Sequence, residues 1–160
     1  MVETTLQIFL DRTAISDLVI QYARSLDSQN WQLCRSCFTD EIEMDYYEYT
    51  GKPATKFRAD EFIAFNSYAL SDLKTQHLST NHQITLDGDK ATCVSNMVAL
   101  HHRSNNRGEN FFNMHGYYTM NLVRTVNDWK IQKIKQSLHW CEGNPTLIPV
   151  EIILAPGTLH

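Results

Sequence analysis

The apolar residues of this chain change their spacing along the sequence, and this change constrains the fold more than any other feature. Up to residue 70 they recur mostly every three or four positions, the spacing of one helix face. From residue 84 onward they alternate with polar residues, the spacing of half-buried strands. Helices followed by consecutive strands predict an α+β fold, because a parallel α/β sheet would require the two to alternate.

Three segments predict helices, over residues 7–27, 28–38 and 59–70, and residues 41–46 predict a strand between the last two. The apolar stripe of the first helix consists of Ile15, Leu18, Val19, Tyr22, Ala23 and Leu26. Long strand patterns follow at residues 90–103, 111–124 and 129–138, and the Asp-Gly pair at residues 87–88 marks a hairpin.

Long strands joined by short turns curl under their own twist. We therefore expect one domain over residues 1–144, with N-terminal helices packed on a strongly curved mixed or antiparallel sheet. This arrangement would form a cone-shaped barrel with an internal pocket. Residues 145–160 contain three prolines and an apolar run, which predict an irregular tail that acts as a lid or as an oligomer contact.

Composition excludes several classes of function. The chain has 160 residues, 42% of them hydrophobic, which suits one domain with a substantial core. A formal net charge of −4 without a basic run gives no support for nucleic-acid or anionic-membrane binding. No signal peptide and no apolar run of ~18 residues is visible, so a cytoplasmic protein without a membrane span is expected.

The four cysteines are interpreted as free thiols in a reducing compartment. Cys34 and Cys37 have the spacing of a redox or metal half-site, but no second such pair accompanies them. They are therefore interpreted as two small apolar residues one helical turn apart. The sequence has no zinc-type spacing of Cys and His, so no metal site is predicted, and it has no phosphate-binding loop or serine-nucleophile motif.

Asp27 is the first candidate for chemistry. It continues the i, i+4 row of Ile15, Val19 and Ala23, which places a carboxylate at the end of the row that should face the core. The helix dipole disfavours an anion at this end, so helix stability does not require Asp there. Two interpretations are open: Asp27 is functional, or Asp27 or Ser28 caps the next helix.

His77 is the second candidate, between the third helix and an alternating strand. Seven positions separate it from Ile84, so the two would face opposite sides of a regular strand. Either His77 precedes the regular ladder or a bulge at residues 79–81 redirects it. A structural histidine is the alternative. Our central hypothesis is that Asp27 and His77 meet in a closed apolar cavity as an acid–base pair.

Strand alternation sorts the remaining polar candidates. Tyr46 shares a face with Ile42 and Met44, so its hydroxyl should point to the core. His101 and its neighbour His102 point to opposite faces, so at most one of them enters a pocket. Another polar row contains Thr119 and Asn121, and it faces either the pocket or solvent.

Several short motifs in the same order resemble the SnoaL-like branch of the nuclear transport factor two superfamily, and within it the scytalone dehydratase-like proteins. The matching segments are YARSLDSQNW at 22–31, MDY at 44–46, TQH at 75–77, DGDKA at 87–91, TMN at 119–121 and DWK at 128–130. They cover most of the chain. The resemblance implies a homo-oligomer, dimer or trimer, and a cofactor-free enzyme.

The resemblance also implies roles for individual residues. In scytalone dehydratase, the positions that match Asp27 and His77 form the catalytic pair, and the tyrosine that matches Tyr46 holds a water on the substrate carbonyl. A second catalytic tyrosine of that enzyme falls at Leu26 here, but a related bile-acid dehydratase has its tyrosine at the position of Tyr22. The departure at Leu26 argues against scytalone itself as the substrate.

A second pocket histidine, a hydroxyl and an amide of that enzyme match His101, Thr119 and Asn121. Aromatic and methionine side chains add an apolar lining suited to a hydrophobic ligand. The predicted substrate-binding residues are therefore His101, Thr119, Asn121, Phe62, Phe65 and Met97.

The expected reaction is an elimination from a small, hydrophobic, cyclic carbonyl compound. His77 would take a proton from a carbon beside the carbonyl, and Asp27 would stabilise the imidazolium. Tyr46 or Tyr22, with His101 and Asn121, would donate to the enolate oxygen. The products would be water and a conjugated alkene. An isomerase or cyclase with the same pair, or a non-catalytic small-ligand-binding module, are the alternatives.

Overall fold

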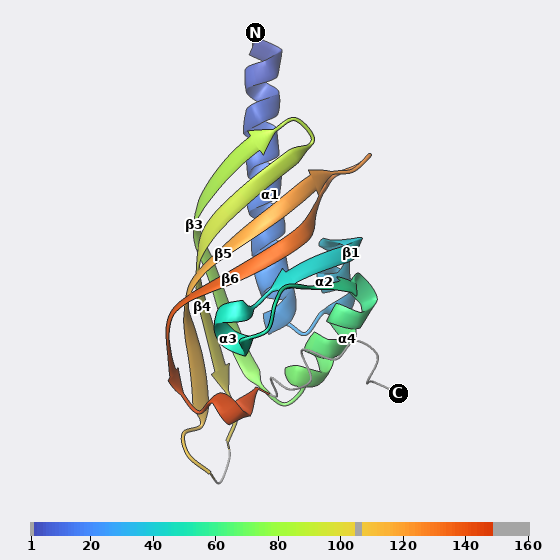
Figure 1. Ribbon diagram of the computed structural model, residues 1–160. Coiled ribbons are helices and arrows are strands. Elements are labelled where there is room, and N and C mark those ends of the chain that lie inside the picture. The colour runs from blue at the N-terminus through green and yellow to red at the C-terminus, as the bar shows by residue number, and fades with distance from the viewer. Residues whose placement is uncertain (1, 105–106, 149–160) are drawn as a thin grey trace.

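The computed structural model describes residues 2–104 and 107–148, which form a long helix, a six-stranded sheet and short helices beside it (Figure 1). The helices are α1 (Val2–Asp27), α2 (Trp31–Ser36), α3 (Tyr47–Thr50) and α4 (Ala59–Ala69), with a 3-10 turn, η1 (Pro145–Leu147). The strands are β1 (Phe38–Asp45), β2 (Thr55–Arg58), β3 (Lys74–Asp87), β4 (Lys90–His102), β5 (Phe111–Arg124) and β6 (Trp129–Gly143).

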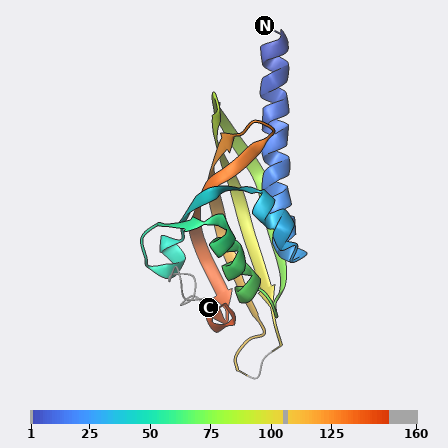
Figure 2. The same ribbon diagram turned by 90° about the vertical axis from the view of Figure 1, so that its right-hand side faces the viewer.

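The strands form one mixed sheet in the order β2-β1-β6-β5-β4-β3. Neighbouring strands are antiparallel except β1 and β6, which are parallel. The sheet is curled but not closed, and α1 packs along it, with α2 and α4 beside the C-terminal end of α1 (Figure 2). The predicted α+β class is therefore confirmed. That residues 1–144 form one independent domain stays a prediction.

A bulge in β3 resolves the parity conflict at His77. The register between β3 and β4 shifts between Thr80 and Gln83, where β3 has one residue more than β4, and Asn81 adopts a left-handed backbone with φ of 58°. Before the bulge the half-buried positions are odd-numbered, and after it the half-buried and buried positions are even-numbered. His77 and Ile84 consequently face the same side, so the bulge is the correct one of the two predicted explanations.

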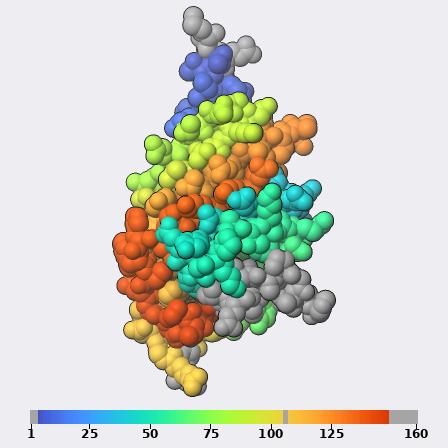
Figure 3. All heavy atoms as spheres, viewed as in Figure 1, coloured from blue at the N-terminus to red at the C-terminus, as the bar shows by residue number. Residues whose placement is uncertain are grey.

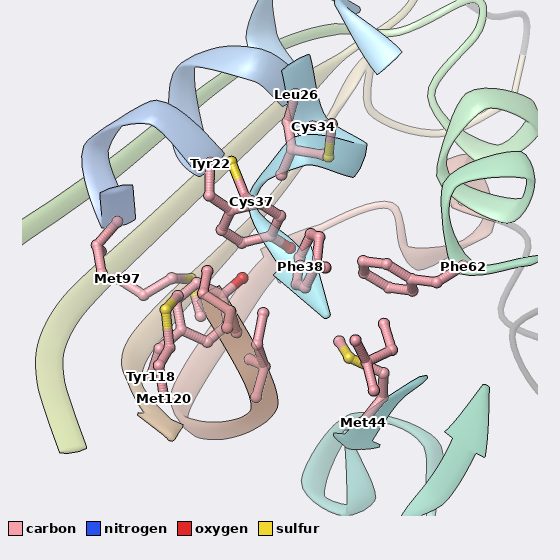
Figure 4. Packing of buried hydrophobic residues seen from close by; sticks show 14 of the residues in the cluster. Tyr22, Leu26, Cys34, Cys37, Phe38, Met44, Phe62, Met97, Tyr118 and Met120 are labelled. Carbon is pink, nitrogen blue, oxygen red and sulfur yellow. The ribbon is translucent and has the colours of Figure 1, made fainter. Parts of the chain in front are cut away.

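Aromatic side chains at the C-terminal end of α1 connect the helices to the sheet (Figure 4). Phe38 lies between Tyr22 and Phe62, with edge-to-face contacts at 5.2 and 5.4 Å between ring centroids. Cys34 and Cys37 are fully buried in the same core. Burial raises the pKa of both thiols, that of Cys34 to about 12, so neither is a reactive thiolate. Their interpretation as small apolar residues is confirmed.

The element boundaries differ from the prediction at several places. The short helix α3 and the edge strand β2 were not predicted. The last strand was predicted to end at residue 138, but β6 continues to Gly143. The chain then forms η1, and Leu147 and Ile148 are buried. The lid or oligomer contact predicted for residues 145–160 falls mostly on residues 149–160, outside the described residues.

The N-terminal turns of α1 project beyond the sheet, as the space-filling view shows (Figure 3). Leu6, Phe9 and Leu10 in this part of the helix are 50–66% exposed. The C-terminal half of α1 is different, because its apolar stripe is buried on the sheet and delivers Asp27 to β3.

Candidate active site

Asp27, the last residue of α1, contacts His77 on β3 through three hydrogen bonds. The carboxylate Oδ1 lies 2.6 Å from Nδ1 of His77, and the backbone N–H of His77 donates to Oδ1 and Oδ2 at 3.0 and 2.9 Å. Thr75 donates its hydroxyl to Oδ1 at 2.9 Å. Asn30 caps α2 instead, which removes the capping interpretation of Asp27. The predicted contact between the two side chains is therefore present.

The hydrogen bonds decide the charge of Asp27. Burial alone would raise the pKa of this carboxyl, but hydrogen bonds from the ring and backbone of His77 and from Thr75 outweigh burial and lower it. Asp27 is thus an anion at neutral pH, and Nδ1 of His77 carries the proton that it shares with the carboxylate. Nε2 of a neutral His77 then has a free lone pair, as a general base requires.

His77 lines a cavity of about 60 Å³ that is bounded by the C-terminal end of α1, by α3, α4 and strands β3 to β6, and by Ile148. Among the predicted site residues, Tyr22, Tyr46, Phe65 and His101 also line it. A volume of this size holds a few water molecules. Typical small-molecule sites measure ~300–1,000 Å³, so a ring-sized ligand requires this cavity to widen.

His101 faces the cavity as predicted, but its hydrogen bonding differs from the prediction. Its Nδ1 lies 2.9 Å from the carbonyl oxygen of Phe112, and its ring packs edge-on against that of His77 at 5.5 Å. Burial, and then the nearby charge of His77, lower the pKa of His101 to about 4. A neutral His101 that donates Nδ1–H to Phe112 has only a lone pair at Nε2. His101 is therefore an acceptor, and the predicted donation to an enolate is wrong.

Tyr22 and Tyr46 are the candidate donors instead. Both line the cavity. Burial raises the pKa of both phenols well above the usual value, so both stay protonated and can donate to a bound molecule.

The predicted positions of Thr119 and Asn121 are wrong. They alternate along β5 with the buried Tyr118 and Met120, so they face the opposite side of the sheet. Asn121 donates to Thr92 at 3.2 Å. It lines a separate hollow of about 660 Å³ that charged side chains border. That hollow is larger than the cavity but contains neither Asp27 nor His77, so it is not the candidate site.

Two further predicted lining residues lie outside the cavity. Phe62 packs on Phe38 in the core, and Met97 is 1% exposed and borders a void of only about 10 Å³ beside Tyr22 and His77. Both are part of the packing that supports the site.

Sequence reasoning missed four polar residues of the cavity, Tyr49, Asn66, Tyr118 and Gln136. Tyr118 had a signal, because it shares the strand parity of the apolar Met114 and Met120. Tyr49 had none, since it lies in the short helix α3, which was not predicted. Burial raises the pKa of Tyr118 to about 12, so its phenol is neutral.

Two absences apply to the described part of the chain. Within residues 2–104 and 107–148, no group of three His, Cys, Asp or Glu side chains is arranged to hold a metal ion. None of the helices in these ranges is long and apolar enough to cross a membrane.

Comparison with protein families and curated proteins gives a consistent result. The family model described as "SnoaL-like domain" matches residues 7–135. The scytalone dehydratase of Colletotrichum orbiculare is 28% identical over 153 residues, covering 84% of this chain and 76% of that protein. The scytalone dehydratase-like protein mdpB of Emericella nidulans is 28% identical over 141 residues, covering 82% of this chain and 66% of that protein.

Solved structures share the fold at lower identity. The Kfla4162 protein of Kribbella flavida aligns with a TM-score of 0.81 and 24% identity, covering 92% of this chain and 99% of that chain. A hexachlorocyclohexane dehydrochlorinase (LinA) Type2 aligns with a TM-score of 0.74 and 18% identity, covering 97% and 99%.

Proposed function

Because this chain belongs to the SnoaL-like domain family, we propose that it is a cofactor-free lyase that removes water from a small, hydrophobic, cyclic carbonyl compound. The observation that carries the proposal is the 2.6 Å contact between Asp27 and His77 at the wall of a cavity. The curated relatives named as scytalone dehydratase and scytalone dehydratase-like support a lyase at 28% identity.

In the first step, Nε2 of His77 takes a proton from the carbon beside the substrate carbonyl. Asp27 keeps Nδ1 protonated and stabilises the imidazolium that forms, as carboxylates do in other His–carboxylate pairs. The electron pair of the C–H bond moves into an enolate, whose oxygen accepts the hydroxyl proton of Tyr46 as a hydrogen bond. Tyr22 lines the same cavity and is a second neutral phenol that can donate to the enolate oxygen.

In the second step, the enolate expels the hydroxyl group on the adjacent carbon. The enolate electrons form the new carbon–carbon double bond, the C–O bond breaks, and the imidazolium returns its proton to the departing oxygen. The products are water and a conjugated alkene, and His77 is neutral again. The protons and electrons of the two steps balance without a cofactor.

The test uses a panel of cyclic ketones with a hydroxyl group on the β carbon. Water loss is followed by the ultraviolet absorbance of the conjugated product and by mass spectrometry. The wild-type protein should turn over at least one member, and Asp27→Asn and His77→Gln should each abolish that turnover. Equal rates in the wild type and both variants would exclude the proposed pair.

Two alternatives use the same site. An isomerase or cyclase would use the Asp27–His77 pair but give a product of unchanged mass, which mass spectrometry distinguishes from water loss. The cavity of about 60 Å³ specifically favours a non-catalytic module that binds a small ligand. That module would bind members of the panel without turnover, and the Asp27 and His77 variants would change only affinity.

We further propose a cytoplasmic homo-oligomer, dimer or trimer. The four cysteines are free thiols, which suits a reducing compartment. Tyr117 and Trp140 are 36% and 56% exposed on the outer side of the sheet and offer apolar surface for a second copy. Light scattering coupled to size-exclusion chromatography would contradict the oligomer by giving the 18.5 kDa mass of one chain.

A further inference from the structure

The side chain of Gln136 is a polar group of the cavity that the proposed reaction does not use. Gln136 lies on β6, is 4% exposed and lines the cavity together with His77. Its Nε2 donates to the hydroxyl of Tyr118 and to the sulfur of Met114 at 3.8 Å. Its Oε1 is buried and has no hydrogen-bond partner among the residues that the structure describes. Such an acceptor is costly to bury unless something binds it.

Tyr49 of α3 is a second group of this kind in the same cavity. Its ring stacks on Phe112 with 6.0 Å between centroids, which fixes the direction of the phenol. Its hydroxyl is buried without a hydrogen-bond partner in residues 2–104 and 107–148. Burial also raises the pKa of this phenol, so it remains a donor. The cavity therefore contains one unpaired acceptor and one unpaired donor.

We propose that Gln136 and Tyr49 form a polar subsite that binds a hydroxyl group of the substrate. A hydroxyl is one donor and also an acceptor, so a single group satisfies both side chains: it donates to Oε1 of Gln136 and accepts from Tyr49. A carbonyl group would satisfy Tyr49 alone and leave Gln136 unpaired. The subsite therefore selects ligands that have an O–H group over their ethers and ketones.

The proposed subsite and the Asp27–His77 pair are on different strands of the cavity wall. Strands β5 and β4 separate β6, which bears Gln136, from β3, which bears His77. The proposal therefore assigns the hydroxyl bound at Gln136 as a specificity group, distinct from the leaving group at His77. Only this assignment of the reacting end rests on the proposed function.

The test measures binding of two ligands that do not react, 2-naphthol and its methyl ether 2-methoxynaphthalene, by isothermal titration calorimetry. The wild type should bind 2-naphthol roughly 10-fold more tightly, because only the naphthol donates to Oε1, and 10-fold corresponds to about 1.4 kcal/mol. Gln136→Met should abolish this preference, whereas Tyr49→Phe should weaken the binding of both ligands and keep the preference, because the oxygen of either ligand accepts from Tyr49. Gln136→Met should also raise the thermal midpoint without ligand, since it removes the unpaired acceptor.

A matched control is Gln132→Met, the same substitution at an exposed position of β6, which should keep the preference. The proposal is overturned if Gln136→Met retains the preference, as it would if a resident water occupied the subsite, or if the wild type binds neither ligand. Asp27→Asn should keep the preference for 2-naphthol. If the wild type prefers 2-naphthol but turns over no panel ketone, the lyase is refuted and the subsite is supported. If a panel ketone is turned over but Gln136→Met keeps the preference for 2-naphthol, the subsite is refuted and the lyase is supported.

Discussion

Helix α1 has two shielded aspartates, Asp11 near its middle and Asp27 at its C-terminal end, and their surroundings differ in a way that bears on function. Asp11 is 6% exposed and accepts two hydrogen bonds from the guanidinium of Arg124 at 2.8 and 2.6 Å. The indole of Trp129 and the amide of Gln7 add bonds at 3.2 and 3.1 Å. Hydrogen bonds from Arg124 are the main cause that lowers the pKa of Asp11, to about 2.

Asp27 also has a lowered pKa, but its charged partner is a histidine beside a cavity. Arg124 keeps its proton at every physiological pH, and it is held in place by stacking on Trp129 at 4.4 Å and by Asp89. His77 instead lies next to a cavity. The two shielded carboxylates therefore differ in their partner and in the adjacent space, and this difference is the reason that only Asp27 is proposed as catalytic.

The largest expected effect comes from Asp27→Asn. We expect kcat/KM to fall by roughly 10³- to 10⁴-fold, because the amide cannot stabilise the imidazolium and disturbs the tautomer of His77. Steady-state kinetics on an accepted ketone measures the loss. The control Asp17→Asn changes an exposed residue of the same helix and should leave the rate unaltered. A loss of less than 10-fold for Asp27→Asn would contradict a catalytic role for Asp27.

Asp11→Asn should act on stability instead. We expect the free energy of unfolding to fall by about 3 kcal/mol, the lower end for a broken buried ion pair, since the side chain of Arg124 is 31% exposed. Urea unfolding measures this change, and kcat/KM of the folded protein should be unaffected. If Asp11→Asn reduced kcat/KM as strongly as Asp27→Asn, the two aspartates of α1 would not differ in role.

The pH dependence of stability should be another property of the cavity region, because His101 is buried there. The folded pKa of His101 is lowered to about 4, below the ~6.5 of an unfolded chain. The unfolded state therefore binds the proton first, so the stability that neutral His101 contributes is complete above pH ~6.5 and is lost as the pH falls towards ~4. The full span is at most about 3 kcal/mol.

The measurement is the difference in unfolding free energy between the wild type and His101→Gln across pH 4 to 7. This difference should change by roughly 2–3 kcal/mol in favour of the variant as the pH falls. His102→Gln changes the exposed neighbour and should show no such slope. A parallel pH dependence in the wild type and His101→Gln would show that His101 is not buried in its neutral form.

The smallest effect concerns the bulge beside the site. Asn81 has φ of 58°, which glycine adopts freely and a β-branched residue does not. Asn81→Gly should therefore change stability by only a few tenths of a kcal/mol, whereas Asn81→Val should cost about 1–2 kcal/mol. Thermal unfolding of both variants tests this. Equal stabilities would mean that the left-handed backbone at Asn81 does not hold the bulge.

Much of this architecture was predictable because it depends on local patterns. The i, i+4 row of α1 predicted that Asp27 faces inward, and the Asp-Gly pair predicted the β3–β4 hairpin. The conflict of parity between His77 and Ile84 even indicated a bulge. Strand alternation also indicated the correct inward face of β5, because Tyr118 and Met120, the residues on either side of Thr119, are apolar. The resemblance to scytalone dehydratase outweighed that signal and led to the wrong face.

The remaining features depend on contacts that no local pattern contains. The tautomer of His101 is set by the carbonyl of Phe112, its partner on the neighbouring strand β5. Tyr49 and Gln136 reach the cavity only because α3 packs beside β6 after the sheet has curled. The edge strand β2 has four residues, too few for alternation to be recognised.

The extra residue of β3 has a geometric consequence for the whole sheet edge. Between Thr80 and Gln83, β3 advances three positions while β4 advances two, from Asn96 to Val94. An edge strand with surplus length must follow a longer arc than its neighbour, so the edge wraps around α1 instead of lying flat. Deleting Asn81 would keep His77 and Ile84 on their present side, because an even number of positions would then separate them. The deletion would straighten the arc. The single extra residue at the bulge therefore contributes to the depth of the cavity beside His77.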